Sequence, residues 1–295
     1  MSWYRAMILM LLVAVVGLAL WASFSLGSPL GHSTRTIAWE ERPGPGLIRL
    51  QTTGKVRELT PLMDWAQRYQ IALAGWLGIP AQPVTVRMFA DAQSMRSWCL
   101  DNLPGYTKAM NFCYVPGENT VYAYCEDLEW MRPRLQHELF HAIVRGAAGE
   151  PPLWLNEGTA ELCEALQLGQ DGQLQLSRVQ TDRLRFAGRL ALRGNLDPNA
   201  LHQVSARDFY GKDAMRWYSL GYVTALWLAR QGTLVDQLHG GTAPIDRMQW
   251  TSFVTDPAAW ESARKALGNQ FEPRPISALT PASAAAGLHA NQDQP

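Results

Sequence analysis

Two histidines and a glutamate with the spacing His137-Glu138-x-x-His141 are the residues of this chain best placed to do chemistry. They lie in a run from Pro133 to Val144 that is predicted to form one helix. Residues four apart on a helix lie on the same face, so both imidazoles can point at one metal ion, with zinc–nitrogen distances of about 2.0–2.1 Å. Glu138 flanks that point, where a general base for a metal-bound water belongs.

A third metal ligand is needed, because a catalytic zinc usually has three protein ligands and one open position. Glu157 offers it from a second apolar-periodic segment, Leu153 to Leu166, which follows a break rich in Gly and Pro. Such a break lets the second helix fold back against the first. Glu161 faces the same way as Glu157 and could accept the free N–H of a ligand histidine, which would orient the ring. Gly158 removes a side chain where two helices and a metal would crowd together.

The two motifs together resemble those of the peptidase-MA-like gluzincins, zinc metallopeptidases with a His-His-Glu site. The second motif is Pro152-Leu-Trp-Leu-Asn-Glu-Gly-Thr-Ala-Glu161. The resemblance implies His137, His141 and Glu157 as Zn²⁺ ligands and Glu138 as the base. It spans roughly Leu47 to Leu238 in layout, although only the two motifs are specific.

The same resemblance implies an oxyanion donor from later in the chain, where gluzincins often supply a Tyr or His. Tyr218, in Trp217-Tyr-Ser-Leu-Gly-Tyr222, matches the family pattern best, and Tyr222 is the alternative. Fifteen residues separate His141 from Glu157, which is shorter than in thermolysin-like enzymes, and the G-A-M-E-N motif of aminopeptidases is absent. These departures favour the smaller MA-like group.

The composition bounds the class of protein. The 295 residues carry 26 Lys+Arg and 26 Asp+Glu, so the net charge is zero and nothing in the composition indicates a nucleic-acid partner. The length suggests one or two domains with a core large enough to be stable alone. The twelve tryptophans are expected to pack in that core or to anchor interfaces.

The first 27 residues predict export. After Arg5, the chain is apolar or small from Ala6 to Phe24, close to the ~20 residues that span a bilayer as a helix. The length favours an uncleaved membrane anchor over a signal peptide, whose apolar core is usually about 7–15 residues. The alternative is a signal peptide cleaved before Ser28. In both cases the body of the protein is expected on the extracytoplasmic (periplasmic) side of the cytoplasmic membrane.

Four cysteines follow in the exported part: Cys99, Cys113, Cys125 and Cys163. An even number in an exported protein is compatible with two disulfides, for which the sequence alone leaves three pairings. Buried free thiols are the alternative.

The rest of the chain predicts the elements that must position the site. A tether is expected at 28–46, a metallopeptidase domain at 47–272 and a disordered tail at 273–295. The expected strands begin at Leu47 and Val84, and a hairpin is expected from Met110 to Cys125, with its second strand (Thr120–Tyr124) at the sheet edge above the metal. The expected helices cover 59–77, 91–100, 177–193 and 214–230.

The prediction is therefore an α+β, zincin-like fold. It would have a small, mostly antiparallel sheet with helices, a helical C-terminal half and the active-site cleft between them. The expected reaction is hydrolysis of a peptide bond in a peptide or protein substrate. A zinc-bound water would attack, and Glu138 would move the proton. Two alternatives stay open: a membrane-tethered binding or assembly factor without turnover, and a zinc amidase acting on cell-wall peptide.

Overall fold

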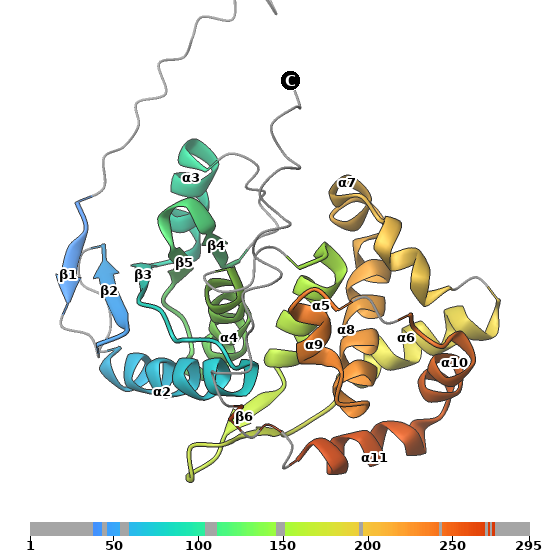
Figure 1. Ribbon diagram of the computed structural model, residues 1–295. Helices are drawn as coiled ribbons and strands as arrows, with labels where there is room; N and C mark the ends of the chain where they lie inside the picture. Colours follow the sequence, from blue (N-terminus) through green and yellow to red (C-terminus); the bar gives the residue numbers. More distant parts are fainter. Residues whose placement is uncertain are drawn as a thin grey trace, which may run out of the picture.

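A five-stranded mixed sheet occupies the first half of the molecule and a mostly helical half lies beside it (Figure 1). The structure is a computed structural model that describes residues 38–42, 46–53, 59–103, 111–145, 151–194, 197–241, 244–268, 271 and 273–274. Its overall class is mixed α/β, with a second, two-stranded sheet.

The large sheet has the strand order β1-β2-β3-β5-β4. The strands are β1 (Glu40–Arg42), β2 (Ile48–Thr52), β3 (Val84–Phe89), β4 (Cys113–Val115) and β5 (Thr120–Tyr124). The pairs β2–β3 and β3–β5 are parallel, and only the two outer pairs, β1–β2 and β4–β5, are antiparallel. The prediction of a mostly antiparallel sheet is therefore wrong.

The parallel pairs arise from two crossover helices. Helix α2 (Thr60–Leu77) joins β2 to β3, and α3 (Ala92–Asn102) follows β3. A crossover of this length returns the chain to the end of the sheet where it started, so the next inner strand runs parallel. Both helices were predicted. Asp91 caps α3 as expected by accepting a hydrogen bond from the Ser94 N–H, and α2 ends at Gly78, which has a left-handed φ of 69°.

The predicted hairpin is confirmed, but its edge assignment is wrong. β4 pairs antiparallel with β5 through the 3-10 turn Pro116–Glu118. β5 lies between β3 and β4, and all five of its residues are buried. The edge of the sheet is therefore β4. The physical reason is that the long apolar run Thr120–Tyr124 is covered on both faces, as inner strands are, whereas β4 is short and only half-buried.

The two motif helices follow directly. Helix α4 (Leu128–Arg145) contains the predicted run but begins five residues earlier, because Asp127 caps it by accepting from the N–H groups of Glu129 and Trp130. Helix α5 (Leu153–Cys163) is shorter than its apolar run. The end of that run forms β6 (Leu166–Leu168), which pairs with β7 (Leu174–Leu176).

The helical half packs around α8 (Ala214–Arg230), which lies against α5 (Figure 1). The other helices are α6 (Thr181–Leu192), η2 (Pro198–Gln203), α7 (Ala206–Phe209), α9 (Leu234–Leu238), α10 (Arg247–Thr255) and α11 (Pro257–Leu267). The α5–α8 contact needs glycine on both sides: a Cβ added to Gly158 would lie 2.3 Å from the backbone of Gly221. Gly158 is therefore crowded as expected, but by the backbone of α8 and not by the first motif helix.

In the described part of the chain, no helix is both long and apolar enough to cross a membrane. The predicted anchor at 1–27 lies outside the described residues, as does the predicted tail from residue 275 onward. Export and anchoring stay predictions.

Candidate metal centre

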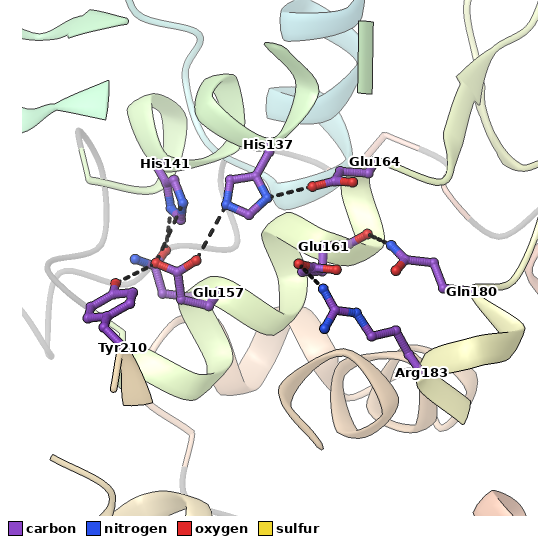
Figure 2. Close-up of polar contacts among 9 residues, drawn as sticks. His137, His141, Glu157, Glu161, Glu164, Gln180, Arg183 and Tyr210 are labelled. Atoms are coloured by element: carbon purple, nitrogen blue, oxygen red, sulfur yellow. Dashed lines mark hydrogen bonds and ion pairs between the residues drawn. The ribbon is translucent and has the colours of Figure 1, made fainter. Parts of the chain in front are cut away.

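Helix α4 presents His137 and His141 on one face, and α5 brings Glu157 opposite them (Figure 2). The Nε2 atom of His137 lies 3.4 Å from Glu157 Oε2, and Nε2 of His141 lies 3.9 Å from Glu157 Oε1. The three side chains are almost buried, and one ligand atom from each lies within 4.8 Å of the others. The three predicted ligands are thus brought together, and they could hold a metal ion.

The far side of each imidazole ring is fixed by another residue. Nδ1 of His137 is 3.0 Å from Glu164 Oε1, and Nδ1 of His141 is 3.1 Å from Asn156 Oδ1. Since both oxygens are acceptors, each Nδ1 carries the proton and donates it, which leaves each Nε2 lone pair free for a metal. The tautomers needed for metal binding are therefore set by the protein.

The carboxylate that orients His137 is Glu164, and the prediction of Glu161 is wrong. Glu161 instead accepts a hydrogen bond from Arg183 of α6 at 2.8 Å (Figure 2). The reason lies in helix geometry: seven residues make nearly two full turns, with a drift of about 20°, whereas four residues overshoot one turn by about 40°. Glu164, seven residues after Glu157, stays on the face that looks at α4. Glu161 turns toward α6.

Glu138 is buried beside the histidines. Burial in low dielectric raises the pKa of its carboxyl to about 7, against opposing effects from His137 and from a hydrogen bond that the backbone N–H of Tyr114 donates. Tyr114 lies in β4, so this bond links the predicted base to the edge strand of the sheet. A carboxyl with a pKa near neutral can both accept and return a proton at physiological pH.

The ligand charges are strongly coupled. Burial lowers the pKa of His137, but its hydrogen bonds to Glu157 and Glu164 outweigh burial and raise the pKa above its usual range. Burial lowers the pKa of His141 to about 4. For Glu157, burial opposes ionisation, yet the two histidines reverse this and hold its pKa at about 2. The shifts therefore favour an ionised Glu157, and the carboxylates of Glu157 and Glu164 make protonation of His137 easier.

Two tyrosines lie beside Glu157, and sequence reasoning missed the one that is hydrogen-bonded to it. Tyr210 donates its hydroxyl proton to Glu157 Oε1 at 2.7 Å (Figure 2). The predicted donor Tyr218 packs its ring 6.4 Å from that of Tyr210, and burial together with the Glu157 charge raises the pKa of its hydroxyl. Tyr222 is fully buried, and its hydroxyl accepts from the Gln180 N–H at 2.8 Å. Tyr222 is thus engaged away from the centre, while Tyr218 stays a prediction.

A groove gives access to this centre. One cavity of about 420 Å³ is lined by His141, Glu157 and Tyr210 together with Tyr114 of β4. A second, of about 650 Å³, shares Tyr114 with the first and continues past Asn119. The candidate ligands therefore border an open cavity that reaches Tyr114 in the edge strand of the sheet.

No model of a known protein family matches the chain, and no curated protein matches it in sequence. The class is therefore defined by fold and site alone. This is a mixed α/β protein with a His-His-Glu cluster that could hold a metal ion, set between a sheet with its helices and a helical half.

Proposed function

We propose that this protein is a zinc-dependent metallopeptidase of the gluzincin type. The observation that carries the proposal is the convergence of the His137 and His141 Nε2 atoms on Glu157 while both Nδ1 atoms are held from behind. In a tetrahedral zinc site, ligand atoms lie about 3.3 Å apart for bonds of 2.0–2.1 Å. The shorter histidine–glutamate distance already matches this spacing, and the longer one needs only a small contraction.

The donor set fits zinc. Two imidazole nitrogens and one carboxylate are the three protein ligands of a common type of catalytic zinc site. The same set can hold iron in other proteins, so the metal analysis must report both. The buried glutamate directly after the first histidine supports a hydrolytic zinc site, because a hydrolase needs a base at that point.

The chain's own residues would do most of the work of hydrolysis. Zinc bound there would lower the pKa of a coordinated water to about 7. Glu138 would take the proton of the attacking water and return it to the leaving amine. A tyrosine hydroxyl, from Tyr218 as the resemblance implies or from Tyr210, which lies closer to Glu157, would donate to the developing oxyanion.

A peptide would lie along β4, which is the sheet edge that borders the groove. Extended peptides add to such edges through main-chain hydrogen bonds. Ala123, in the inner strand β5, cannot make these contacts, because its neighbours on both sides are other strands. A proline at Ala123 would disrupt the sheet and so would not report on peptide docking. A proline substitution that tests docking should instead be made at Val115 in the edge strand β4.

Two measurements test the function. Metal analysis of the purified protein should give about one zinc per chain, lost or weakened in Glu157→Gln. Glu138→Gln should retain zinc and abolish cleavage of an unfolded protein substrate. Zinc without any turnover of peptides in the wild type would favour the non-catalytic binding factor. Cleavage of purified cell-wall fragments in place of unfolded protein would favour the amidase.

A further inference from the structure

Helix α3 covers the face of the sheet opposite to the one that carries Val86 and Val121. Its buried residues are Met95 and Cys99, which lie one helical turn apart and so point the same way. The ring of Trp98 stacks on Tyr122 of β5 with a centroid distance of 4.9 Å and an interplanar angle of 24°. The buried stripe of α3 is therefore held over the Tyr122 side of the sheet.

The strand register brings Cys113 to the same place. Cys113, the first residue of β4, pairs directly with Tyr122 across the antiparallel ladder. Directly opposite residues of such a pair present their side chains on the same face, with Cβ atoms about 4.5–5.5 Å apart. Cys113 therefore points toward α3, and the neighbouring Cys99 thiol, together with burial, raises the pKa of the Cys113 thiol.

The two remaining cysteines lie elsewhere. Cys163 is buried at the end of α5 beside Tyr69, whose hydroxyl donates to the Cys163 carbonyl at 3.2 Å. Cys125 extends the β5 ladder, since its N–H bonds to the Phe89 carbonyl. It is three residues from Tyr122, and alternation along a strand directs it to the opposite face. Of the three pairings open to the sequence, only one joins Cys99 to Cys113, and its second bond, Cys125–Cys163, is not compatible with this placement.

We propose that Cys99 and Cys113 form a disulfide that ties helix α3 to the edge strand β4, and that Cys125 and Cys163 stay as free thiols. The oxidant is a disulfide on a small molecule such as oxidised glutathione or on a thiol oxidoreductase. Cys113 is the more accessible of the two thiols. Its thiolate attacks the oxidant, forming a mixed disulfide and releasing the first oxidant thiol.

The second step closes the bond within the chain. The Cys99 thiolate attacks the Cys113 sulfur and expels the second oxidant thiol. One S–S bond forms in the protein and one breaks in the oxidant. Two electrons and two protons pass from the cysteines to the oxidant, which leaves as two thiols.

The disulfide would constrain β4, the strand beside the candidate metal centre. β4 has three residues, and it is paired with a strand on one side only. Tyr114, next to Cys113, donates its backbone N–H to Glu138. A covalent bond at Cys113 would hold this strand in register, and with it the donor to the candidate base. The proposal of the disulfide itself does not depend on the proposed function.

Peptide mapping of the full-length protein tests the pairing. The protein is equilibrated with oxidised and reduced glutathione at an oxidising ratio, free thiols are alkylated, and the chain is digested without reduction. Cleavage after Lys108 separates Cys99 from Cys113, and cleavage after Glu118 separates Cys113 from Cys125. We expect one cross-linked pair of peptides containing Cys99 and Cys113. Alkylation of all four cysteines, or any other cross-link, would overturn the proposal.

Thermal unfolding gives a second readout with a matched control. The bond closes a loop of about 15 residues, which corresponds to a rise in melting temperature of about 6–12 °C in a domain of this size. Oxidised wild type and Cys125→Ser should both lose this increment when a phosphine reductant is added. Cys113→Ser should melt at the same temperature with and without reductant. A wild type whose melting does not respond to reductant would contradict the proposal.

Discussion

Replacing Glu164 by Gln tests whether the candidate metal centre is oriented as the structure has it. Glu164 Oε1 accepts the Nδ1–H of His137 at 3.0 Å, a bond between a carboxylate and a ligand imidazole. Gln keeps the shape and an acceptor oxygen but removes the charge that makes His137 a better metal ligand. Loss of such a partner typically weakens metal affinity about 10–100-fold, or about 1.4–2.7 kcal/mol.

The pH dependence of this loss has a defined sign. The Glu164 carboxylate also helps to raise the pKa of His137, so protons compete more strongly with zinc for this imidazole. Glu164→Gln lowers that pKa and so removes part of the competition from protons. The loss of zinc affinity should therefore be smaller at low pH, where protons compete for His137, and should grow as the pH rises and His137 loses its proton in both proteins.

Glu161→Gln is the matched control, because Glu161 lies in the same helix but pairs with Arg183. We expect it to lower the melting temperature and to leave zinc affinity within about twofold, since it contacts no ligand. Competition with a chromophoric chelator, at fixed ionic strength and several pH values, measures both variants. If Glu161→Gln weakens zinc binding as much as Glu164→Gln does, the assignment of Glu164 is refuted.

Three other measurements address the surroundings of the centre. Gly158→Ala should lower the free energy of unfolding by about 1–3 kcal/mol in chemical unfolding, because its Cβ would lie 2.3 Å from backbone atoms of Gly221. Gly75→Ala is the control: its Cβ would have no neighbour closer than 3.5 Å, so the change should be neutral or stabilising. Tyr210→Phe should weaken zinc affinity severalfold, because it removes the hydrogen bond to Glu157. If Tyr218 is the oxyanion donor, Tyr218→Phe should retain zinc and lower kcat about 10²–10³-fold. An equal loss of zinc affinity in both variants would contradict these roles. The depressed pKa of Glu157, about 2, means that the metal-free protein should lose up to about 3 kcal/mol as pH falls from about 4.5 toward 2, visible as falling melting temperatures that Glu157→Gln does not show.

Much of the site could be predicted because it depends on local periodicity. An i, i+4 pair on a strongly periodic helix must share a face, so the convergence of His137 and His141 follows from the sequence. Glu157 follows almost as directly, since a Gly/Pro break between two apolar helices leaves them to pack antiparallel. The bounds of α8 and the N-cap at Asp91 were also predicted from local sequence patterns, and both predictions are confirmed.

The parts that sequence reasoning missed depend on contacts between distant segments. Tyr210 reaches Glu157 from the position just after the four-residue helix α7, and nothing in its neighbourhood in the sequence marks it. Arg183 of α6, the partner of Glu161, could not be found from the sequence, although the angular offset along α5 already favoured Glu164 over Glu161. The edge of the sheet could not be assigned from the hairpin alone, because which of its two strands pairs with β3 is decided by the crossover through α3.

The carboxylates clustered around the candidate metal centre favour a bound cation. Glu138, Glu157, Glu161 and Glu164 lie close together, Arg183 is paired with Glu161, and the carboxylates raise the pKa of His137. Buried carboxylates are costly unless they are balanced. Burial raises the pKa of Glu138, and the nearby charges of Glu157 and Glu164 add to this effect. Two further positive charges at the Nε2 atoms would shift the pKa of Glu138 back down, because a bound cation dominates the local field. Glu138 would then be ionised at neutral pH, the state that a general base requires, so the ligands that could hold the metal would also set the protonation of the base.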